Sequence, residues 1–281
     1  MKTYNTIANL QDCLNNYKRD GKSMGFVPTM GALHKGHISL IEQCNANNDI
    51  SVCSIFVNPT QFNNSADLDQ YPRTIEQDLI MLEKANCDIV FIPQTETMYS
   101  DESEEIAFNF GSLELVMEGK DRPGHFQGVG TIVKKLFEII KPNNAYFGKK
   151  DYQQLLIIKD LRDQYNLSPQ IIGCEIVREN DGLAMSSRNM RLTAPQREQA
   201  PYIRQIMLWA KDNKANYSPD ELIAEVEKRI NSNPLMEIGY FEISEANTLA
   251  KCQQWRQGIK YIAFIVVAMG DIRLIDNIEL F

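Results

Sequence analysis

The sequence predicts an α/β fold: a Rossmann-like parallel sheet with helices on both faces, followed by a smaller C-terminal α+β domain. Up to residue 176, short apolar runs rich in β-branched residues alternate with amphipathic segments, which is the pattern of βαβ units. The runs are apolar nearly throughout, as expected for strands buried on both faces of a sheet. Beyond that point helices come first and strands follow. We therefore predict two domains, 1–176 and 177–281.

The elements are expected in the following order. Strands are predicted over residues 24–27, 50–57, 88–93, 106–110, 145–148 and 170–177, and in the second domain over 239–243, 261–268 and 272–277. Helices are predicted over residues 6–19, 38–44, 74–86, 126–141, 149–165, 196–213 and 218–232. Thr74 is a helix-capping residue type, and Ser218 with Glu221 forms a capping box around a Pro at the first helical position.

Composition limits the function classes. The formal net charge of −8 argues against broad binding to nucleic acids or anionic membranes, which requires a surplus of Lys and Arg. The six cysteines form no Cys-x-x-Cys pair, so we expect a reduced, cytoplasmic setting and neither a zinc site nor a disulfide framework. Residues 1–10 lack the apolar core of a signal peptide, and the longest apolar run, 261–269, is too short to span a bilayer.

The turn after the first predicted strand, residues 28–37, is the leading candidate for a binding site. A strand, a glycine-containing turn and a helix N-terminus direct backbone N–H groups at an anion. His34 and His37 are three residues apart and can face the same side, and Gly36 lets a flat ring approach the backbone. The pattern indicates a nucleotide site with imidazoles that bond to phosphates. The alternative is a pair of structural histidines, because a His-x-Gly-His match also arises by chance.

Other groups could complete such a site. Lys150 follows a strand-ending glycine at a helix start, where its ammonium could meet phosphate oxygens or could face solvent. The run 186–188, Ser-Ser-Arg, can bind a triphosphate, or can be an N-cap with a surface arginine. Gln61 and Gln154 could bind a small polar acid, or could be polar surface. The sequence contains no P-loop, kinase or hydrolase signature.

Several segments together resemble the pantoate–β-alanine ligase (pantothenate synthetase) family over nearly the full chain. They are residues 28–37, 56–62, 71–74, 122–126 with 128–129, 147–148 with 150–151 and 153–154, 185–189 and 273–277. Each match is weak alone, but the order and spacing of all of them are specific. Two positions depart from the family pattern: Lys149, where another polar residue is frequent, and Gly239, where an acidic residue is usual.

This resemblance implies an AMP-forming ligase that makes a carbon–nitrogen bond on the route to coenzyme A. (R)-Pantoate would attack the α-phosphate of ATP, giving pantoyl adenylate and pyrophosphate, and β-alanine would then displace AMP to give pantothenate. The resemblance also implies that ATP is a substrate, that Mg²⁺ is required, that the C-terminal domain is a lid, and that the enzyme is a homodimer. The rival interpretations are another His-x-Gly-His adenylyltransferase and a non-catalytic nucleotide-binding paralogue.

The resemblance also assigns roles to residues. The catalytic set would be His37, His34, Lys150, Ser186, Ser187 and Arg188. The ATP site would comprise Met30, Gly31, Ala32, Leu33, His34, Lys35, Gly36, His37, Gly148, Lys149, Lys150, Asp151, Val177, Met185, Ser186, Ser187 and Arg188. Pantoate would be bound by Gln61, Gln154 and Met30, with Gln61 also contacting β-alanine; Asn58 and Tyr71 would shape the pocket, and Asp78 would be a metal-side carboxylate.

Overall fold

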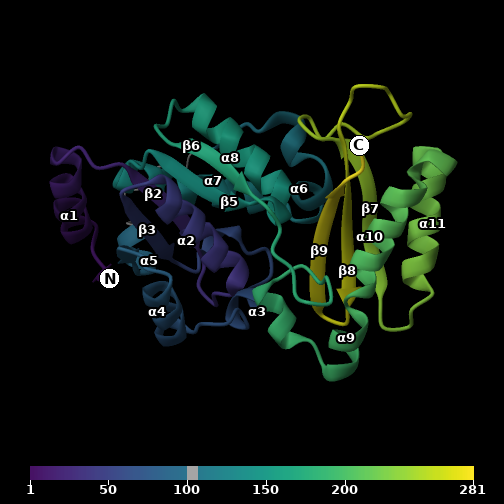
Figure 1. Cartoon of the computed structure of the whole chain (residues 1–281), viewed down its shortest axis with the longest axis horizontal. Helices are drawn as coiled ribbons and strands as arrows, with labels where there is room; N and C mark the ends of the chain where they lie inside the picture. The colour runs from purple at the N-terminus through teal and green to yellow at the C-terminus, as the bar shows by residue number, and fades with distance from the viewer. Residues whose placement is uncertain (100–106) are drawn as a thin grey trace. The chain divides into compact units, whose positions relative to one another are not determined.

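The computed structural model describes residues 1–99 and 107–281 (Figure 1). These residues divide into two compact units. The first comprises Met1–Glu114 and Glu118–Glu175, and the second comprises Leu115–Met117 and Ile176–Phe281. The main boundary lies one residue before the one predicted from the sequence. The assignment of residues 115–117 to the second unit was not foreseen.

The first unit is built on a parallel sheet. The strands found among its described residues are β1 (Lys2–Tyr4), β2 (Met24–Thr29), β3 (Ile50–Ile55), β4 (Ile89–Phe91), β5 (Asn144–Gly148) and β6 (Gln170–Cys174). They lie in the order β1-β4-β3-β2-β5-β6, and all the pairs are parallel. From β2 the sheet thus extends through β3 and β4 on one side and through β5 and β6 on the other. The predicted parallel sheet is confirmed. The short, largely exposed β1 was missed because three residues carry no readable periodicity.

Helices cover both faces of this sheet, as predicted (Figure 1). The longer ones are α1 (Ile7–Arg19), α2 (Lys35–Asn47), α4 (Ile75–Lys84), α7 (His125–Ile140) and α8 (Tyr152–Gln164). Neighbouring strand residues point to opposite faces. Phe26 therefore joins one apolar core with Phe137 of α7, while Val27 joins a second core with Ile41 of α2. Each such buried side chain contributes roughly 1.5–3 kcal/mol to stability, so both helical layers are held firmly to the sheet.

Short helices fill the connections of the first unit. They are η1 (Pro59–Gln61), α3 (Ser65–Asp69), α5 (Thr95–Met98), η2 (Gly111–Glu114), α6 (Met117–Asp121), which begins at the unit boundary, and η3 (Lys149–Asp151). Of the strand predicted over 106–110, residue 106 lies outside the described residues, and residues 107–110 form no strand. The physical reason is that the Gln127 side chain bonds both backbone groups of Phe108, accepting from its N–H at 2.8 Å and donating to its carbonyl at 3.0 Å.

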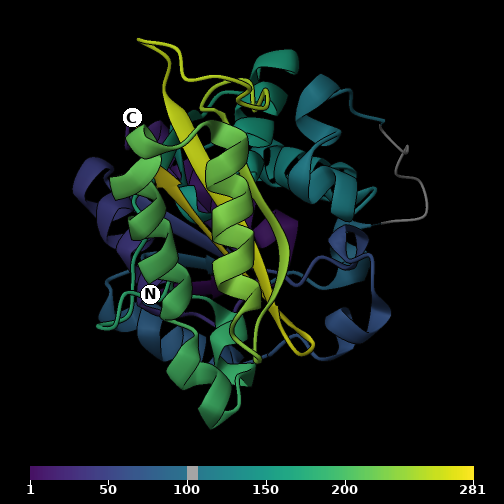
Figure 2. The same ribbon diagram turned by 90° about the vertical axis from the view of Figure 1, so that its right-hand side faces the viewer.

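The second unit combines an antiparallel sheet with helices. Within its described residues the strands are β7 (Glu237–Glu245), β8 (Tyr261–Met269) and β9 (Ile272–Glu279), and the helices are η4 (Ser187–Arg191), α9 (Ala194–Gln199), α10 (Tyr202–Asn213), η5 (Lys214–Asn216) and α11 (Pro219–Asn231). Figure 2 shows α10 and α11, in green, packed against the sheet, with which they share one core. The predicted capping box is confirmed: Ser218 Oγ accepts from the Glu221 N–H at 3.3 Å, and Glu221 Oε2 accepts from the Ser218 N–H at 2.8 Å.

The helix predicted over 196–213 is in fact two helices, α9 and α10, separated at Pro201. Proline has no backbone N–H and its ring clashes with the preceding turn, so the helix stops and restarts there. The hydrophobic periodicity continues across the break and concealed it. Among the helices of residues 1–99 and 107–281, none has both the length and the hydropathy needed to cross a bilayer.

Gly239 lies at an irregularity in β7, where the register with β8 shifts between Ile238 and Tyr240. A Cβ placed on Gly239 would come within 3.0 Å of Val266 Cγ1 on the central strand. That distance is tighter than ordinary side-chain contacts. The acidic side chain usual in the family pattern would therefore press on Val266 in this backbone, and glycine relieves the crowding.

Candidate active site

The His loop, defined as residues 30–34, leads from the carboxyl end of β2 into α2. Gly31 has φ +79° and Ala32 has φ +49°, so the chain turns here through left-handed backbone. A Cβ on Gly31 would lie 3.0 Å from both Asp78 Oδ2 and Ile55 Cγ2, so space and backbone both call for glycine. The strand order reverses beside β2, between β3 and β5. In open parallel sheets ligands bind at this position, beyond the carboxyl ends of the strands.

The two histidines of this turn cap the helix that follows. His34 is the N-cap residue of α2, and its Nδ1 accepts from the Gly36 N–H at 3.1 Å. His37 Nδ1 accepts from the His34 N–H at 3.3 Å, and the two ring centroids are 4.1 Å apart. Because each Nδ1 is an acceptor, the hydrogen-bond pattern assigns the proton of each neutral ring to Nε2. Two neighbouring Nε2–H donors therefore lie at the N-terminus of α2.

Both rings are held neutral by their surroundings. Burial and, to a smaller extent, the positive charge of Lys150 lower the pKa of His34 to about 4, against the opposing effect of Asp151. Burial likewise lowers the pKa of His37 to about 3, with His34 and Lys150 adding to the effect. Near neutral pH the pair therefore offers hydrogen-bond donors without carrying charge.

Lys150 and the two histidines are brought together by the pairing of β5 with β2. Lys150 belongs to η3, directly after β5, and its charge acts on both imidazoles. Lys149, one residue earlier, forms an ion pair with Glu175, which is largely exposed. The two adjacent lysines thus have different surroundings, and Lys150 is the one near the His loop. This arrangement combines an ammonium with two neutral donors, which suits the phosphates of a nucleotide.

Two of the predicted pantoate residues, Gln61 and Met30, contact each other. Gln61 is 9 % exposed, and its amide nitrogen lies 3.2 Å from the sulfur of Met30. Asn58 donates to Gln61 Oε1 at 3.2 Å and to the Gly128 carbonyl at 3.1 Å, and its own oxygen accepts from the Tyr99 hydroxyl at 2.6 Å. Asn58 is therefore fully bonded. It fixes the Gln61 side chain in place from behind.

Two residues that were not among the predicted site residues fix the backbone of Gln61. His125 Nδ1 lies 2.8 Å from the Gln61 carbonyl oxygen, and Arg122 Nη2 donates to the same oxygen at 3.4 Å. A carbonyl can only accept, so the proton of His125 is on Nδ1, and Nε2 accepts from Arg122 Nη1 at 3.3 Å. The signal for this role was present in the sequence, since His125 is the third of three histidines and also lies in a glycine-rich stretch.

The bonding of His125 predicts a pH-dependent loss of stability. Burial lowers its folded-state pKa to about 4, with a further contribution from the charge of Arg122. As pH falls below about 6.5, His125 becomes protonated in the unfolded chain but stays neutral in the folded protein. The free energy of unfolding therefore decreases until the pH reaches the folded-state pKa of His125. Between pH 7.5 and 5.0 this single group should remove about 2 kcal/mol.

The measurement is urea unfolding at both pH values in the wild type and in His125→Asn, whose amide can still donate to the Gln61 carbonyl. The decrease in unfolding free energy should be smaller in the variant by about that amount. His34 and His37 contribute the same pH dependence to both proteins and cancel in the comparison. Equal decreases in the two proteins would show that folded His125 is not held neutral.

Gln154 and its neighbour Gln153 have different roles. Gln153 is 4 % exposed and is bonded at both ends of its amide, accepting from the Glu118 N–H at 3.0 Å and donating to the Leu113 carbonyl at 2.7 Å. Gln154 is half-buried, and its side chain forms no hydrogen bond with any other described residue. Tyr71 is buried, with its ring edge-on to Phe62 at 5.7 Å between centroids.

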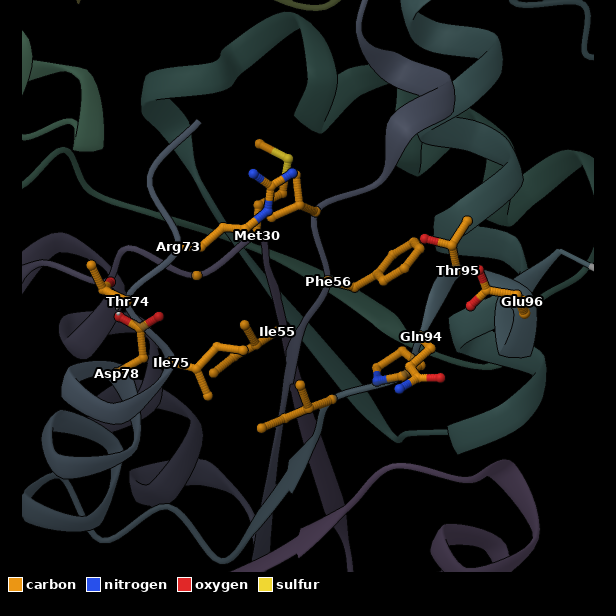
Figure 3. Close-up of a pocket in the computed structure, with 14 residues that line it drawn as sticks. Met30, Ile55, Phe56, Arg73, Thr74, Ile75, Asp78, Gln94, Thr95 and Glu96 are labelled. Atoms are coloured by element: carbon orange, nitrogen blue, oxygen red, sulfur yellow. Dashed lines mark hydrogen bonds between the residues drawn. The ribbon is translucent and has the colours of Figure 1, made fainter. Parts of the chain in front are cut away.

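A cavity of about 340 Å³ adjoins the His loop within the first unit (Figure 3). Met30, Gly31 and Asp78 form part of its wall, and Ile55 and Ile92 line it near the ends of β3 and β4. Its volume is within the range of small-molecule sites. The carboxyl ends of three adjacent strands therefore surround one ligand-sized space.

The Mg²⁺ that the family resemblance implies has no prepared ligand set among the described residues, where no group of three or more His, Cys, Asp or Glu side chains could hold a metal ion. Asp78 is 1 % exposed. Its Oδ2 accepts from the Ala32 N–H at 3.0 Å, and its Oδ1 accepts from the Leu33 N–H at 2.8 Å and from Thr74 Oγ1 at 3.1 Å. This bonding does not fit the expected role of a metal-side carboxylate.

Five of the predicted residues belong to the second unit. Val177 and Met185 are joined across a narrow hairpin, in which the Met185 N–H donates to the Val177 carbonyl at 3.0 Å. Ser186 follows as the N-cap of η4, its hydroxyl accepting from the Arg188 N–H at 3.3 Å, and Ser187 is buried. The hairpin and the start of η4 therefore carry Val177, Met185 and the predicted phosphate residues in one continuous segment.

An arginine that was not predicted anchors this hairpin. Arg178 forms a bidentate pair with Asp276 of β9, with N···O distances of 2.7 and 2.9 Å, and donates to the Gly182 carbonyl at 3.0 Å. Asp276 is 4 % exposed, so the pair is shielded from water. The hairpin is thereby fixed to the sheet of the second unit. The matching segment 273–277 had been noted in the sequence without a role.

Comparison with known proteins finds relatives that match nearly the whole chain. Residues 2–279 match the family model described as pantoate-beta-alanine ligase. A pantothenate synthetase of Flavobacterium psychrophilum is 48% identical over 268 residues, covering 95% of each chain, and one of Bacteroides fragilis is 47% identical over 279 residues, covering 99% of each.

Solved structures agree as well. A pantothenate synthetase from Thermus thermophilus, 36% identical, superimposes with a TM-score of 0.92 over the whole of both chains. A pantoate-beta-alanine ligase from Francisella tularensis, described as complexed with beta-gamma ATP and beta-alanine, is 36% identical with a TM-score of 0.84, covering 100% of this chain and 98% of that one. The fold and these full-length matches together show that the chain belongs to the pantoate–β-alanine ligase family.

Proposed function

We propose that this chain condenses (R)-pantoate with β-alanine at the expense of ATP, in two chemical steps. In the first, a pantoate carboxylate oxygen attacks the α-phosphorus, and pyrophosphate leaves. In the second, the amine of β-alanine attacks the acyl carbon, AMP leaves with the carboxyl oxygen, and the amide nitrogen loses a proton. Activation is required because a carboxylate does not condense with an amine at neutral pH. The adenylate supplies a leaving group that the free acid lacks.

The observation that carries the proposal is the pair of neutral imidazoles at the N-terminus of α2, with Lys150 adjacent. In the first step charge builds on the oxygens around the α-phosphorus. The Nε2–H groups of His34 and His37 would bond to those oxygens, and Lys150 would balance their charge. These donors are already oriented by the helix cap, so they need no rearrangement as the charge develops.

Pantoate is assigned to the residues around Gln61. The amides of Gln61 and Gln154 would bond the hydroxyl and carboxylate groups of pantoate, and Met30 would pack on its methyl groups. Support comes from the fixed position of Gln61 and from the available amide of Gln154. β-Alanine would also contact Gln61. The Francisella tularensis relative, whose structure is described as complexed with beta-gamma ATP and beta-alanine, supports the use of ATP and β-alanine here.

The family resemblance supplies the assignment of the nucleotide. Gly148, Asp151 and Val177 would line the nucleoside site, and Ser186, Ser187 and Arg188 would bind the β- and γ-phosphates. The hairpin anchored by Arg178 supports this grouping within the second unit. The lid role of that unit remains a prediction.

We further propose that Mg²⁺ arrives bound to the triphosphate. Mg²⁺ retains several waters and is usually held by substrate phosphates with few protein ligands, in accord with the bonding of Asp78. The cytoplasmic location and the homodimer are likewise proposals. The cytoplasmic location is supported by six free, buried cysteines, because a reducing compartment keeps cysteines as thiols.

Isotope exchange between labelled pyrophosphate and ATP tests the two-step reaction. Exchange should require pantoate and should proceed without β-alanine, because the first step alone is reversible. Adding β-alanine should then release AMP and pantothenate in equal amounts. Exchange that needs β-alanine would contradict an adenylate intermediate, and a product that retains AMP would favour a different adenylyltransferase.

A further inference from the structure

We propose that Asp78 is a positioning residue for the reaction, whose carboxylate holds the His loop in the conformation that aims His34 and His37. This inference rests on the proposed function, because it assigns Asp78 to the loop that carries the catalytic imidazoles. The family resemblance suggested a metal-side role for this residue. The hydrogen bonds of the structure point to a different one.

The His loop needs an external anchor. Gly31 and Ala32 both have left-handed backbone, a conformation that residues with a Cβ adopt at an energetic penalty. Such a conformation persists only where surrounding contacts enforce it. The backbone N–H groups of Ala32 and Leu33 both donate to the carboxylate of Asp78, which lies 46 and 45 residues further along the chain.

The carboxylate is committed to this task. Its side chain is 1 % exposed and forms no ion pair within the described part of the chain. A carboxylate removed from water must be compensated by hydrogen bonds. Two backbone N–H groups of the loop supply two of these bonds. The hydroxyl of Thr74 supplies a third (Figure 3). The two sides stabilise each other: the loop satisfies the carboxylate, and the carboxylate fixes the loop.

The position of this anchor connects it to the chemistry. Leu33 immediately precedes His34, whose ring caps α2 and whose N–H is bonded by His37. Fixing residues 32 and 33 therefore fixes where the helix begins and which way both rings face. A catalytic donor that is misplaced by about 1 Å can lose about 10²-fold in rate. Asp78 would act on the reaction through this geometry without touching a substrate.

Asp78→Asn tests the proposal, since the amide keeps the shape but replaces one acceptor oxygen by an NH₂ group that faces a backbone N–H. We expect kcat of pantoate-dependent pyrophosphate exchange to fall about 10- to 100-fold, while KM for ATP changes less than about threefold. Thr74→Val removes only the hydroxyl bond to Oδ1 and should give a smaller decrease in kcat.

Asp88→Asn is the matched control. Asp88 Oδ2 also accepts from a backbone N–H and a hydroxyl, both of Ser51, at 2.8 and 3.1 Å, but at the amino end of β3, away from the His loop. The Asp88→Asn substitution should lower Tm without lowering kcat. If Asp78→Asn and Asp88→Asn change Tm and kcat alike, the effect of Asp78 is general stability and the proposal fails.

Two further readouts separate the possibilities. The Mg²⁺ concentration for half-maximal exchange should be the same in Asp78→Asn and the wild type. A large increase, with kcat restored by excess Mg²⁺, would overturn the proposal in favour of a metal ligand.

NMR of the imidazole nitrogens is a readout that does not depend on enzyme activity. In Asp78→Asn the His34 and His37 signals should move away from the neutral, Nε2-protonated pattern of the wild type, and unchanged signals would overturn the proposal. Absence of pantoate-dependent exchange in the wild type would instead contradict the proposed function.

Discussion

Replacement of His37 by alanine is expected to slow adenylate formation by about 10²–10³-fold in a protein that still folds. The structure assigns the proton of His37 to Nε2, since its Nδ1 accepts from the His34 N–H. Its pKa of about 3 keeps the ring neutral at any pH used in an assay. The variant therefore lacks one oriented hydrogen-bond donor that would stabilise the charge developing at the α-phosphate. This donor is missing at every pH used in the assay.

Single-turnover formation of the adenylate, without β-alanine, measures this step directly. Two further variants separate the two functions of the ring. His37→Asn retains an acceptor near the Nδ1 position and should preserve the helix cap, which is worth about 1 kcal/mol. His37→Gln retains a donor near the Nε2 position and should preserve more of the rate. Near-normal adenylate formation in His37→Ala, or a faster Asn variant than Gln variant, would contradict the donor role.

Lys150→Met is expected to reduce kcat/KM for ATP in the exchange reaction by about 10²-fold or more, because an ammonium near the phosphates is replaced by an apolar side chain. The substitution should also act on the imidazoles. The charge of Lys150 is one of the causes that lower the pKa of His34 and His37. Without it, both pKa values should rise, although burial will keep them below the ordinary value of about 6.5.

Lys149→Met is the comparison, since it removes the same charge one residue earlier. Lys149 is paired with exposed Glu175 and contributes to neither histidine pKa, so the rate should fall by far less and the imidazole titrations should not move. NMR titration of the histidine rings, together with the exchange assay, gives both readouts. Equal effects of the two substitutions on rate and on titration would contradict the assignment of Lys150 to the site.

Much of the fold could be predicted from local patterns. The apolar runs that became β2 to β6 are recognisable because strands buried on both faces have no polar alternation. The capping box at Ser218 involves only residues within one helical turn of each other, and it forms as predicted. The errors also have local causes: the periodicity of residues 196–213 hid the break at Pro201, and the Gln127 amide removed Phe108 from strand pairing.

The candidate site divides in the same way. The His loop was evident from the sequence because its strand, turn, histidines and helix are contiguous. The role expected of Asp78 came from the family resemblance and does not fit the hydrogen bonds of its carboxylate. Local patterns could not reveal these bonds, because the two backbone N–H partners lie 46 and 45 residues away in the sequence. The bond from His125 to the Gln61 carbonyl, across 64 residues, was likewise missed.

The sequence by itself determined that the chain contains a parallel α/β domain with a glycine- and histidine-containing turn after its first apolar strand, and that an α+β domain follows. Only the tertiary structure decided that β5 lies beside β2, which brings Lys150 to the histidines, and that Asp78 of α4 holds the loop before them. The physical reason is that periodicity and capping are properties of neighbouring residues. Strand order and helix packing arise from contacts between segments far apart in the chain, and the geometry of the site depends on those contacts.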